Sequence, residues 1–135
     1  MEELSSPYIL PQNISSVIKK IKAIGGDKVR FIIIYGSAVK GKLTDKSDID
    51  LAVFYNADMQ KRFEYRVTVL GRVDNIYDIQ IFQDLPIYIQ KDIISYGKVI
   101  YFKNYNEIFD VFMQIIKKFE DFKPYLELYY SKLGV

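Results

Sequence analysis

The 135-residue sequence contains no cysteine, no histidine and no tryptophan. Without cysteine the chain has no disulfide, no thiolate nucleophile and no cysteine metal site. Without histidine it lacks the usual zinc ligand and the usual general base. Any chemistry must therefore use carboxylates, hydroxyls, lysines, arginines or backbone amides.

Neither charge nor hydropathy is strongly one-sided. The 19 Lys and Arg residues against 17 Asp and Glu residues leave a net charge of +2, which is far from the basic excess of a dedicated nucleic-acid binder. We therefore expect no strong nucleic-acid binding. The longest apolar runs, such as residues 31–35, are much shorter than the ~20 residues that a membrane span needs. Glu2 and Glu3 stand where a secretory signal would carry positive charge, so we expect a cytoplasmic protein outside the membrane.

The length of the chain and its 50% hydrophobic residues suit one compact domain with a substantial core. We expect a single domain over residues 1–135, with a catalytic core over about 12–102 and a C-terminal helical segment over about 104–133. No repeat, low-complexity tract or linker divides the sequence.

Hydrophobic periodicity predicts the order of helices and strands. Apolar residues at helical spacing after Asn13, a residue able to cap a helix, predict a first helix that Gly25 and Gly26 end. The predicted strands are residues 29–35, 49–55, 76–82 and 98–102, and the later helices are residues 85–94 and 108–119. Pro124 should end or kink the last helix. The first strand should be central and the third near an edge, in an α+β fold whose small mixed sheet is flanked by helices.

The segment from Ala57 to Val73 fits two periods. Alternation like that of a strand is shown by Phe63, Tyr65, Val67 and Val69, whereas helical spacing is shown by Met59, Phe63, Val67 and Leu70. We favour a helix, because the intervening basic residues suit an exposed helical face. These residues are Lys61, Arg62 and Arg66.

Two aspartates stand two positions apart where the second strand begins, in the stretch Ser47-Asp48-Ile49-Asp50. The period of a strand aims both side chains to one face, with origins ~7 Å apart. Neighbouring carboxylates repel each other and burial removes their solvation, so a bound cation would resolve the cost. With only oxygen ligands present, magnesium is favoured, held by carboxylates and substrate phosphates. Asp78 on a neighbouring strand would supply the third carboxylate.

The first strand ends at Gly36-Ser37, followed by Lys40. Glycine and serine at the exit of a buried strand let the backbone turn sharply and offer amide and hydroxyl donors to a triphosphate. Lys42 and Lys46 could also contact phosphates, although we favour a solvated loop at these positions. The carboxylates and this turn together predict a phosphate-and-metal site for phosphoryl transfer with two magnesium ions.

The pattern Gly-Ser, a basic residue, Ser-Asp-x-Asp and a third Asp resembles the DNA polymerase β-like nucleotidyltransferase superfamily. Within it, the chain length and the closing segments Leu85-Pro86 and 96–101 resemble the minimal nucleotidyltransferase antitoxins, partners of HEPN toxins. The resemblance spans roughly residues 30–102.

That resemblance implies a magnesium-dependent enzyme that transfers AMP from ATP to a hydroxyl, on a tyrosine of a cognate HEPN toxin. It implies that Asp48 and Asp50 hold the metals, that Asp78 completes the site and helps activate the acceptor, and that Gly36 and Ser37 grip the nucleotide. Lys40 stands where these antitoxins often carry arginine, and lysine cannot make the bidentate contact that arginine makes. The partners expected are ATP and the toxin, in a homo- or hetero-oligomer.

Several alternatives remain open. Asp74 competes with Asp78 for the third carboxylate; we favour Asp78 for its clearer strand context. The domain could instead neutralise its toxin by binding without catalysis, or transfer a nucleotide to a small molecule. The C-terminal aromatic residues could form a partner surface or could cover the sheet of this domain. They are Phe119, Phe122, Tyr125, Tyr129 and Tyr130.

Overall fold

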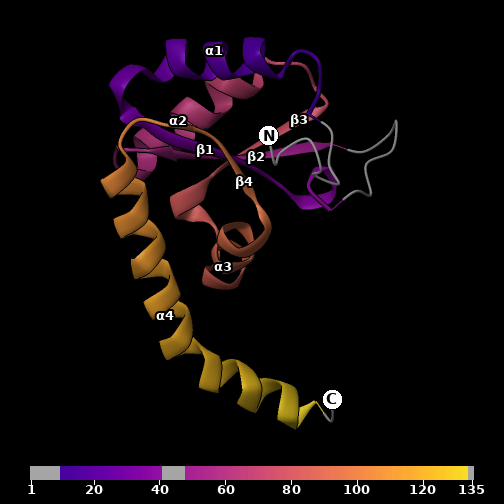
Figure 1. Ribbon diagram of the computed structural model, residues 1–135, viewed down its shortest axis with the longest axis vertical. Helices are drawn as coiled ribbons and strands as arrows, with labels where there is room; N and C mark the ends of the chain where they lie inside the picture. The colour runs from indigo at the N-terminus through magenta and orange to yellow at the C-terminus, as the bar shows by residue number, and fades with distance from the viewer. Residues whose placement is uncertain (1–9, 41–47, 134–135) are drawn as a thin grey trace.

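The computed structural model describes residues 10–40 and 48–133, which fold around one four-stranded sheet (Figure 1). The strands are β1 (Val29–Tyr35), β2 (Ile49–Tyr55), β3 (Tyr77–Ile81) and β4 (Lys98–Phe102), and their order across the sheet is β3-β2-β1-β4. β1 pairs antiparallel with β2 and β4, whereas β2 and β3 are parallel. The predicted strands, the central place of β1 and the edge position of β3 are therefore confirmed, and so is the α+β fold with a mixed sheet.

Helices α1 (Ile14–Gly25) and α2 (Met59–Leu70) cover one face of the sheet. The core on this face joins helix residues such as Val17, Ile21 and Val69 to strand residues such as Ile34 and Leu51. α1 ends where the sequence predicts, because Gly26 takes a positive φ of 59°. Its side chains alternate between core and solvent with helical period.

Helices α3 (Ile87–Tyr96) and the first half of α4 (Tyr105–Lys132) cover the other face. The core there is centred on Phe31, whose ring lies 5.1 Å from that of Phe54, 5.3 Å from that of Phe82 and 5.9 Å from that of Phe112, measured between centroids. Such tilted and edge-on pairs stabilise an aromatic core beyond the area that they bury. Ile115 is the last buried residue of α4.

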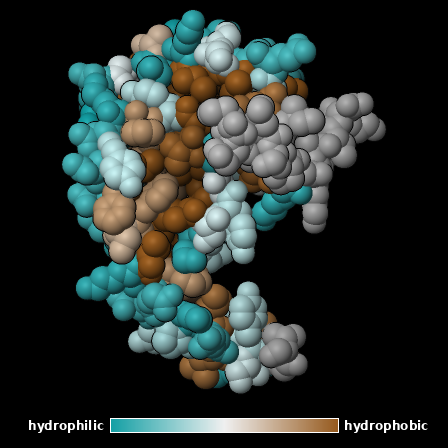
Figure 2. Space-filling model, viewed as in Figure 1, coloured by the Kyte–Doolittle hydropathy of each residue, from teal (hydrophilic) through white to brown (hydrophobic). Residues whose placement is uncertain are grey.

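Beyond that point α4 leaves the body of the molecule and turns in its C-terminal half (Figure 1). The helix does not end at Pro124, which lies inside it. Tyr125, Tyr129 and Tyr130 are exposed, so they do not cover the sheet. Figure 2 shows strongly apolar residues gathered over the middle of the molecule, whereas the projecting end of α4 is a mixture of polar and apolar residues.

Two local predictions needed correction. Asn13 stands at the N-cap of α1, but its side chain makes no capping hydrogen bond there. α2 is a helix, yet it buries Tyr65 and Val69 and leaves the apolar Met59 and Phe63 exposed. The helical spacing of the apolar residues therefore correctly predicted a helix here, but not which face of that helix is buried. Lys42 and Lys46, which could contact phosphates, and Ser47, which precedes the two aspartates, lie outside the described residues.

No helix within residues 10–40 and 48–133 is both long and apolar enough to cross a membrane. The longest, α4, has 28 residues but carries charged side chains throughout its length.

Candidate active site

Asp50 and Asp78 lie side by side on the two parallel strands. They are paired residues in the register of β2 and β3, so their backbones are ~4.8 Å apart and their side chains share a face. Both are partly buried, on the face that α3 and α4 cover. The sequence placed both carboxylates on strands, and the parallel pairing brings them together.

Asp48 precedes β2 by one residue and is exposed. Its negative charge nevertheless acts on Asp50. Burial, followed by the negative charges of Asp78 and then Asp48, raises the pKa of Asp50 from its ordinary value of 3.8 to about 6. The charges of Asp78 and Asp48 therefore both act on Asp50, whose ionisation is already disfavoured by burial.

A hard cation fits this set of oxygen donors, because it would offset the repulsion that raises the pKa of Asp50. Within the described ranges, however, no three acidic, histidine or cysteine side chains are already gathered as a metal site. Magnesium usually takes one or two carboxylates and completes its shell with water and substrate phosphates. The assignment of Asp48, Asp50 and Asp78 as metal ligands stays a prediction.

Two side chains that sequence reasoning missed hold Asp78 in place. Gln80 donates from Nε2 to both carboxylate oxygens of Asp78, at 3.3 Å each. Arg66 of α2 donates from Nε to the carbonyl of Ile79 at 2.7 Å, and its Nη2 lies 3.9 Å from Oδ1 of Asp78. Arg66 therefore anchors to the free edge of β3 and brings a positive charge to the carboxylate. The alternation of β3, which puts Gln80 on the same face as Asp78, was the signal that could have identified Gln80, whereas no sequence signal indicated Arg66.

The competing carboxylate, Asp74, is engaged elsewhere. Its Oδ2 accepts a hydrogen bond of 2.9 Å from Nδ2 of Asn13, and Oδ1 of Asn13 accepts one of 2.6 Å from the hydroxyl of Tyr77. Asn13 thus ties the start of α1 to the turn before β3, which is why it does not cap its own helix. These contacts favour Asp78 over Asp74 as the third carboxylate.

Gly36 forms a sharp corner against Asp50. β1 ends at Tyr35, which pairs with Asp50, and Gly36 then turns with a φ of 77°. A Cβ at this position would collide with Oδ2 of Asp50. Glycine is therefore required at this position for two reasons: the positive φ, and the space that the carboxylate of Asp50 occupies. Gly36 begins a single 3-10 turn, Gly36–Ala38, which contains the partly buried Ser37.

Lys40, the predicted phosphate-binding lysine, lies against α3. Its Nζ is 3.7 Å from Oδ2 of Asp92 and 5.8 Å from the ring centroid of Tyr96. The backbone amide of Lys40 donates to the carbonyls of Gly36 and Ser37, both at 3.2 Å. The side chain is thus one turn from the glycine corner, but its charge is paired with α3.

Tyr35 is a further residue of the site that the sequence left unassigned. It is half-buried beside Asp50. Burial, followed by the negative charges of Asp50 and Asp78, raises the pKa of its hydroxyl above the ordinary value. Its hydroxyl therefore stays protonated and is available as a hydrogen-bond donor next to the carboxylates. Its position directly before Gly36 was the signal that could have identified it.

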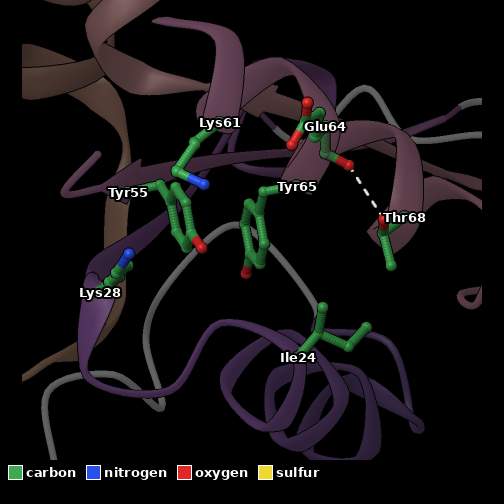
Figure 3. A pocket seen from close by; sticks show the side chains of 7 residues that line it. All are labelled: Ile24, Lys28, Tyr55, Lys61, Glu64, Tyr65 and Thr68. Atoms are coloured by element: carbon green, nitrogen blue, oxygen red, sulfur yellow. Dashed lines mark hydrogen bonds between the residues drawn. The ribbon is translucent and has the colours of Figure 1, made fainter. Parts of the chain in front are cut away.

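A pocket of about 340 Å³ lies away from this site (Figure 3). In its wall the rings of Tyr55 and Tyr65 stack with centroids 3.9 Å apart and an interplanar angle of 4°. Tyr55 is the last residue of β2, and its side chain points to the face opposite Asp50 because side chains alternate along a strand. Lys28 and Lys61 stand beside the two rings in Figure 3. This pocket is therefore separate from the carboxylates.

Comparison with known proteins agrees with this geometry. A family model described as "Polymerase beta, Nucleotidyltransferase" matches residues 12–106. A protein of Methanocaldococcus jannaschii, named "Putative protein adenylyltransferase", is 42% identical over 74 residues. That match covers 55% of this chain and 57% of the relative, so the chain spans little more than half the length of the relative that it matches.

Solved structures show the same fold at lower identity. A toxin–antitoxin complex with AMP-PNP contains a chain with a TM-score of 0.70 and 19% identity, over 89% of this chain and 98% of that one. A Shewanella oneidensis complex of a tri-AMPylated HEPN toxin with an MNT antitoxin gives a TM-score of 0.67 and 17% identity, over 91% and 97% of the two chains. The toxin–antitoxin pair MntA–HepT gives 0.67 and 16%, over 93% and 100%.

Proposed function

Because this chain belongs to the polymerase beta nucleotidyltransferase family, we propose that it transfers AMP from ATP to a tyrosine hydroxyl of a HEPN-family toxin. The observation that carries the proposal is the pair Asp50 and Asp78, level with each other on parallel strands and directly against the corner at Gly36. Two carboxylates that repel each other beside a sharp backbone turn suit the binding of a cation together with a triphosphate.

The acceptor comes from the similar proteins. In the Shewanella oneidensis complex a HEPN toxin carries AMP and is bound to an MNT antitoxin, and the Methanocaldococcus jannaschii relative is named for protein adenylyl transfer. The chain covers 97% of the matched chain of that complex. We therefore propose that this chain acts as the antitoxin of such a pair and silences its partner by adenylylation.

The donor nucleotide would be bound at the glycine corner. Gly36 and Ser37 present the backbone and a hydroxyl to its phosphates, and Lys40 stands one turn away. Lys40 would have to exchange Asp92 for a phosphate, which is favourable because a phosphate carries more charge than the carboxylate. The ion pair between Lys40 and Asp92 is half exposed and long, so its loss costs little.

In the reaction, the acceptor oxygen forms a bond to the α-phosphorus of ATP while the bond from that phosphorus to the leaving pyrophosphate breaks. The hydroxyl proton passes to Asp78, which Gln80 and Arg66 hold in position. Asp48, Asp50 and Asp78 would hold magnesium, which would neutralise charge on the triphosphate and lower the pKa of the acceptor hydroxyl. Tyr35 stays protonated and donates a hydrogen bond within the site.

A second candidate function is neutralisation of the toxin by docking alone. The exposed aromatic residues at the end of α4, Tyr125, Tyr129 and Tyr130, favour a contact with another protein. Both functions can use the same complex, and they differ in whether a covalent product forms.

The test uses the full chain, magnesium, and a HEPN-family toxin as the acceptor. ATP labelled in the α-phosphate should label the partner, whereas ATP labelled in the γ-phosphate should not, because the pyrophosphate leaves. Asp50→Asn should reduce transfer by at least about 100-fold. Inhibition of the toxin without any α-label would contradict catalysis and support docking. Full transfer by Asp50→Asn would contradict the site assignment.

A further inference from the structure

Tyr96 stands at the same end of the sheet as the carboxylates, on the opposite side of the glycine corner. β4 pairs antiparallel with β1, and Ile34 is level with Lys98. Continuing this register by two residues brings Tyr96 level with Gly36. Across the end of the sheet the order is therefore Asp78, Asp50, the corner, and then Tyr96 at the junction of α3 and β4.

The junction that carries Tyr96 is tightly packed. A Cβ at Gly97 would lie 2.7 Å from Cγ2 of Ile33 and 3.2 Å from the carbonyl oxygen of Ile34. The amide of Gly97 also donates a hydrogen bond of 2.7 Å to the carbonyl of Ile93. Only glycine permits this approach, so the end of α3 is fixed directly against the end of β1. The position of Tyr96 relative to the corner is set by packing.

Tyr96 is 66% exposed. It belongs to neither hydrophobic core cluster of the described residues. The ammonium group of Lys40 lies 5.8 Å from the ring centroid of Tyr96, which is at the outer limit of a cation–π contact. A large aromatic surface thus faces solvent beside the predicted phosphate-binding lysine, and the fold does not explain its exposure.

Its distance from the carboxylates suits the far end of a nucleotide. The strand of Asp50 is separated from β4 by two strand spacings, about 10 Å in all. A nucleotide whose α-phosphate lies at the carboxylates must extend its ribose and base away from them. Lys40, between the corner and Tyr96, would contact phosphates beside that path, because the ribose and the β- and γ-phosphates leave the α-phosphorus through different oxygens.

We infer that the ring of Tyr96 is the platform on which the base of the donor nucleotide stacks. This inference rests on the proposed nucleotidyl transfer and adds the residue that binds the base. Stacking uses the π-face that all bases share, so it contributes affinity with little discrimination between adenine and guanine. Lys40 contributes through the phosphates, and Tyr96 through the base alone.

The experiment separates these contributions with two probes, ATP and inorganic tripolyphosphate, each with magnesium. Binding of both to the full chain is measured by titration calorimetry. Tyr96→Leu should weaken ATP binding about 5- to 100-fold, the range expected for loss of one stacked base, and should leave tripolyphosphate binding unchanged. Tyr96→Phe should behave like the wild type. Lys40→Gln should weaken both probes.

Tyr88→Leu is the matched control, because Tyr88 is a comparably exposed tyrosine (51%) at the other end of α3. It should bind both probes like the wild type. In steady-state assays Tyr96→Leu should raise KM for ATP and leave kcat nearly unchanged, as expected for binding energy present in both ground and transition states.

Equal ATP affinity in Tyr96→Leu and the wild type would overturn the inference, and so would an equal loss of both probes, which would indicate disruption of the phosphate site. Either result leaves nucleotidyl transfer standing. If the wild-type chain bound neither probe, the proposed function and this inference would both fail.

Discussion

Replacing Asp50 by asparagine should stabilise the fold while it removes activity. Asp50 is ionised at neutral pH only at a cost, because burial and the charges of Asp78 and Asp48 raise its pKa to about 6. Asparagine has nearly the same shape, carries no charge, and can donate a hydrogen bond to the neighbouring carboxylate. Asp50→Asn therefore relieves the repulsion that the site maintains.

The size of the effect follows from the pKa. A rise from 3.8 to about 6 corresponds to an upper bound of about 3 kcal/mol of unfolding free energy. Asp50 is only half buried, and solvent screens its interactions, so we expect about 1–2 kcal/mol. The native state binds the additional proton, so wild-type stability falls as the pH rises from about 4 to 6. The difference between Asp50→Asn and the wild type should be small below pH 4 and fully developed above pH 6.

The assay is urea unfolding of both proteins at pH 4 and at pH 7.5, without magnesium or nucleotide. The midpoint and slope give the unfolding free energy in each case. Asp110→Asn is the control, because Asp110 is an exposed aspartate of α4, far along the chain from the carboxylates. At pH 7.5 magnesium and ATP should stabilise the wild type by about 2.7 kcal/mol when the ATP concentration is a hundred times its Kd. They should stabilise Asp50→Asn much less.

The reasoning would be refuted if Asp50→Asn were no more stable than the wild type at pH 7.5. An equal gain from Asp110→Asn would also refute it, because the effect would then reflect net charge rather than the site.

Three further substitutions test other parts of the structure. Gly36→Ala should lower the unfolding free energy by about 1–2 kcal/mol, since it strains a positive φ, and should reduce transfer about 100-fold by displacing Asp50; urea unfolding and a transfer assay measure both. Gly25→Ala should lose about 1–2 kcal/mol, because crowding of the stacked tyrosines outweighs the gain in helix propensity, with activity unchanged. Arg66→Gln removes the hydrogen bond to the carbonyl of Ile79 and the positive charge beside Asp78, so transfer should fall about 10- to 100-fold because Asp78 is less well positioned; unchanged transfer would show that Arg66 does not position Asp78.

The strands and the glycine corner could be predicted because their signals are local. A near-continuous apolar run that ends in Gly36-Ser37 predicts a buried strand followed by a turn, and the structure contains β1 and the corner at those residues. The spacing of Asp48 and Asp50 depends only on the period of a strand. These features need no knowledge of which strands are neighbours.

The parts that were missed depend on contacts between distant segments. Met59 and Phe63 repeat at helical spacing, yet they are exposed, because the half-buried Arg62 and Arg66 use that side of α2 to bond Asp84 and the edge of β3. The pattern of hydrophobic residues carries no information about the polar contacts that help to decide which face of a helix is buried.

The pairing of β2 with β3 is another such contact. A sequence shows that Asp50 and Asp78 lie on strands, but only the parallel register makes them directly opposite. A shift of one residue would have put Asp78 on the other face.

The central claim is that Asp78, and not Asp74, joins Asp50 at a site that transfers AMP. The most direct measurement compares Asp78→Asn with Asp74→Asn in transfer of α-labelled AMP from ATP to the HEPN-family partner, with magnesium present. We predict that Asp78→Asn loses transfer by at least about 100-fold, whereas Asp74→Asn, whose carboxylate is bound to Asn13, keeps most of it. Equal activity of the two variants, or loss with Asp74→Asn alone, would contradict the account.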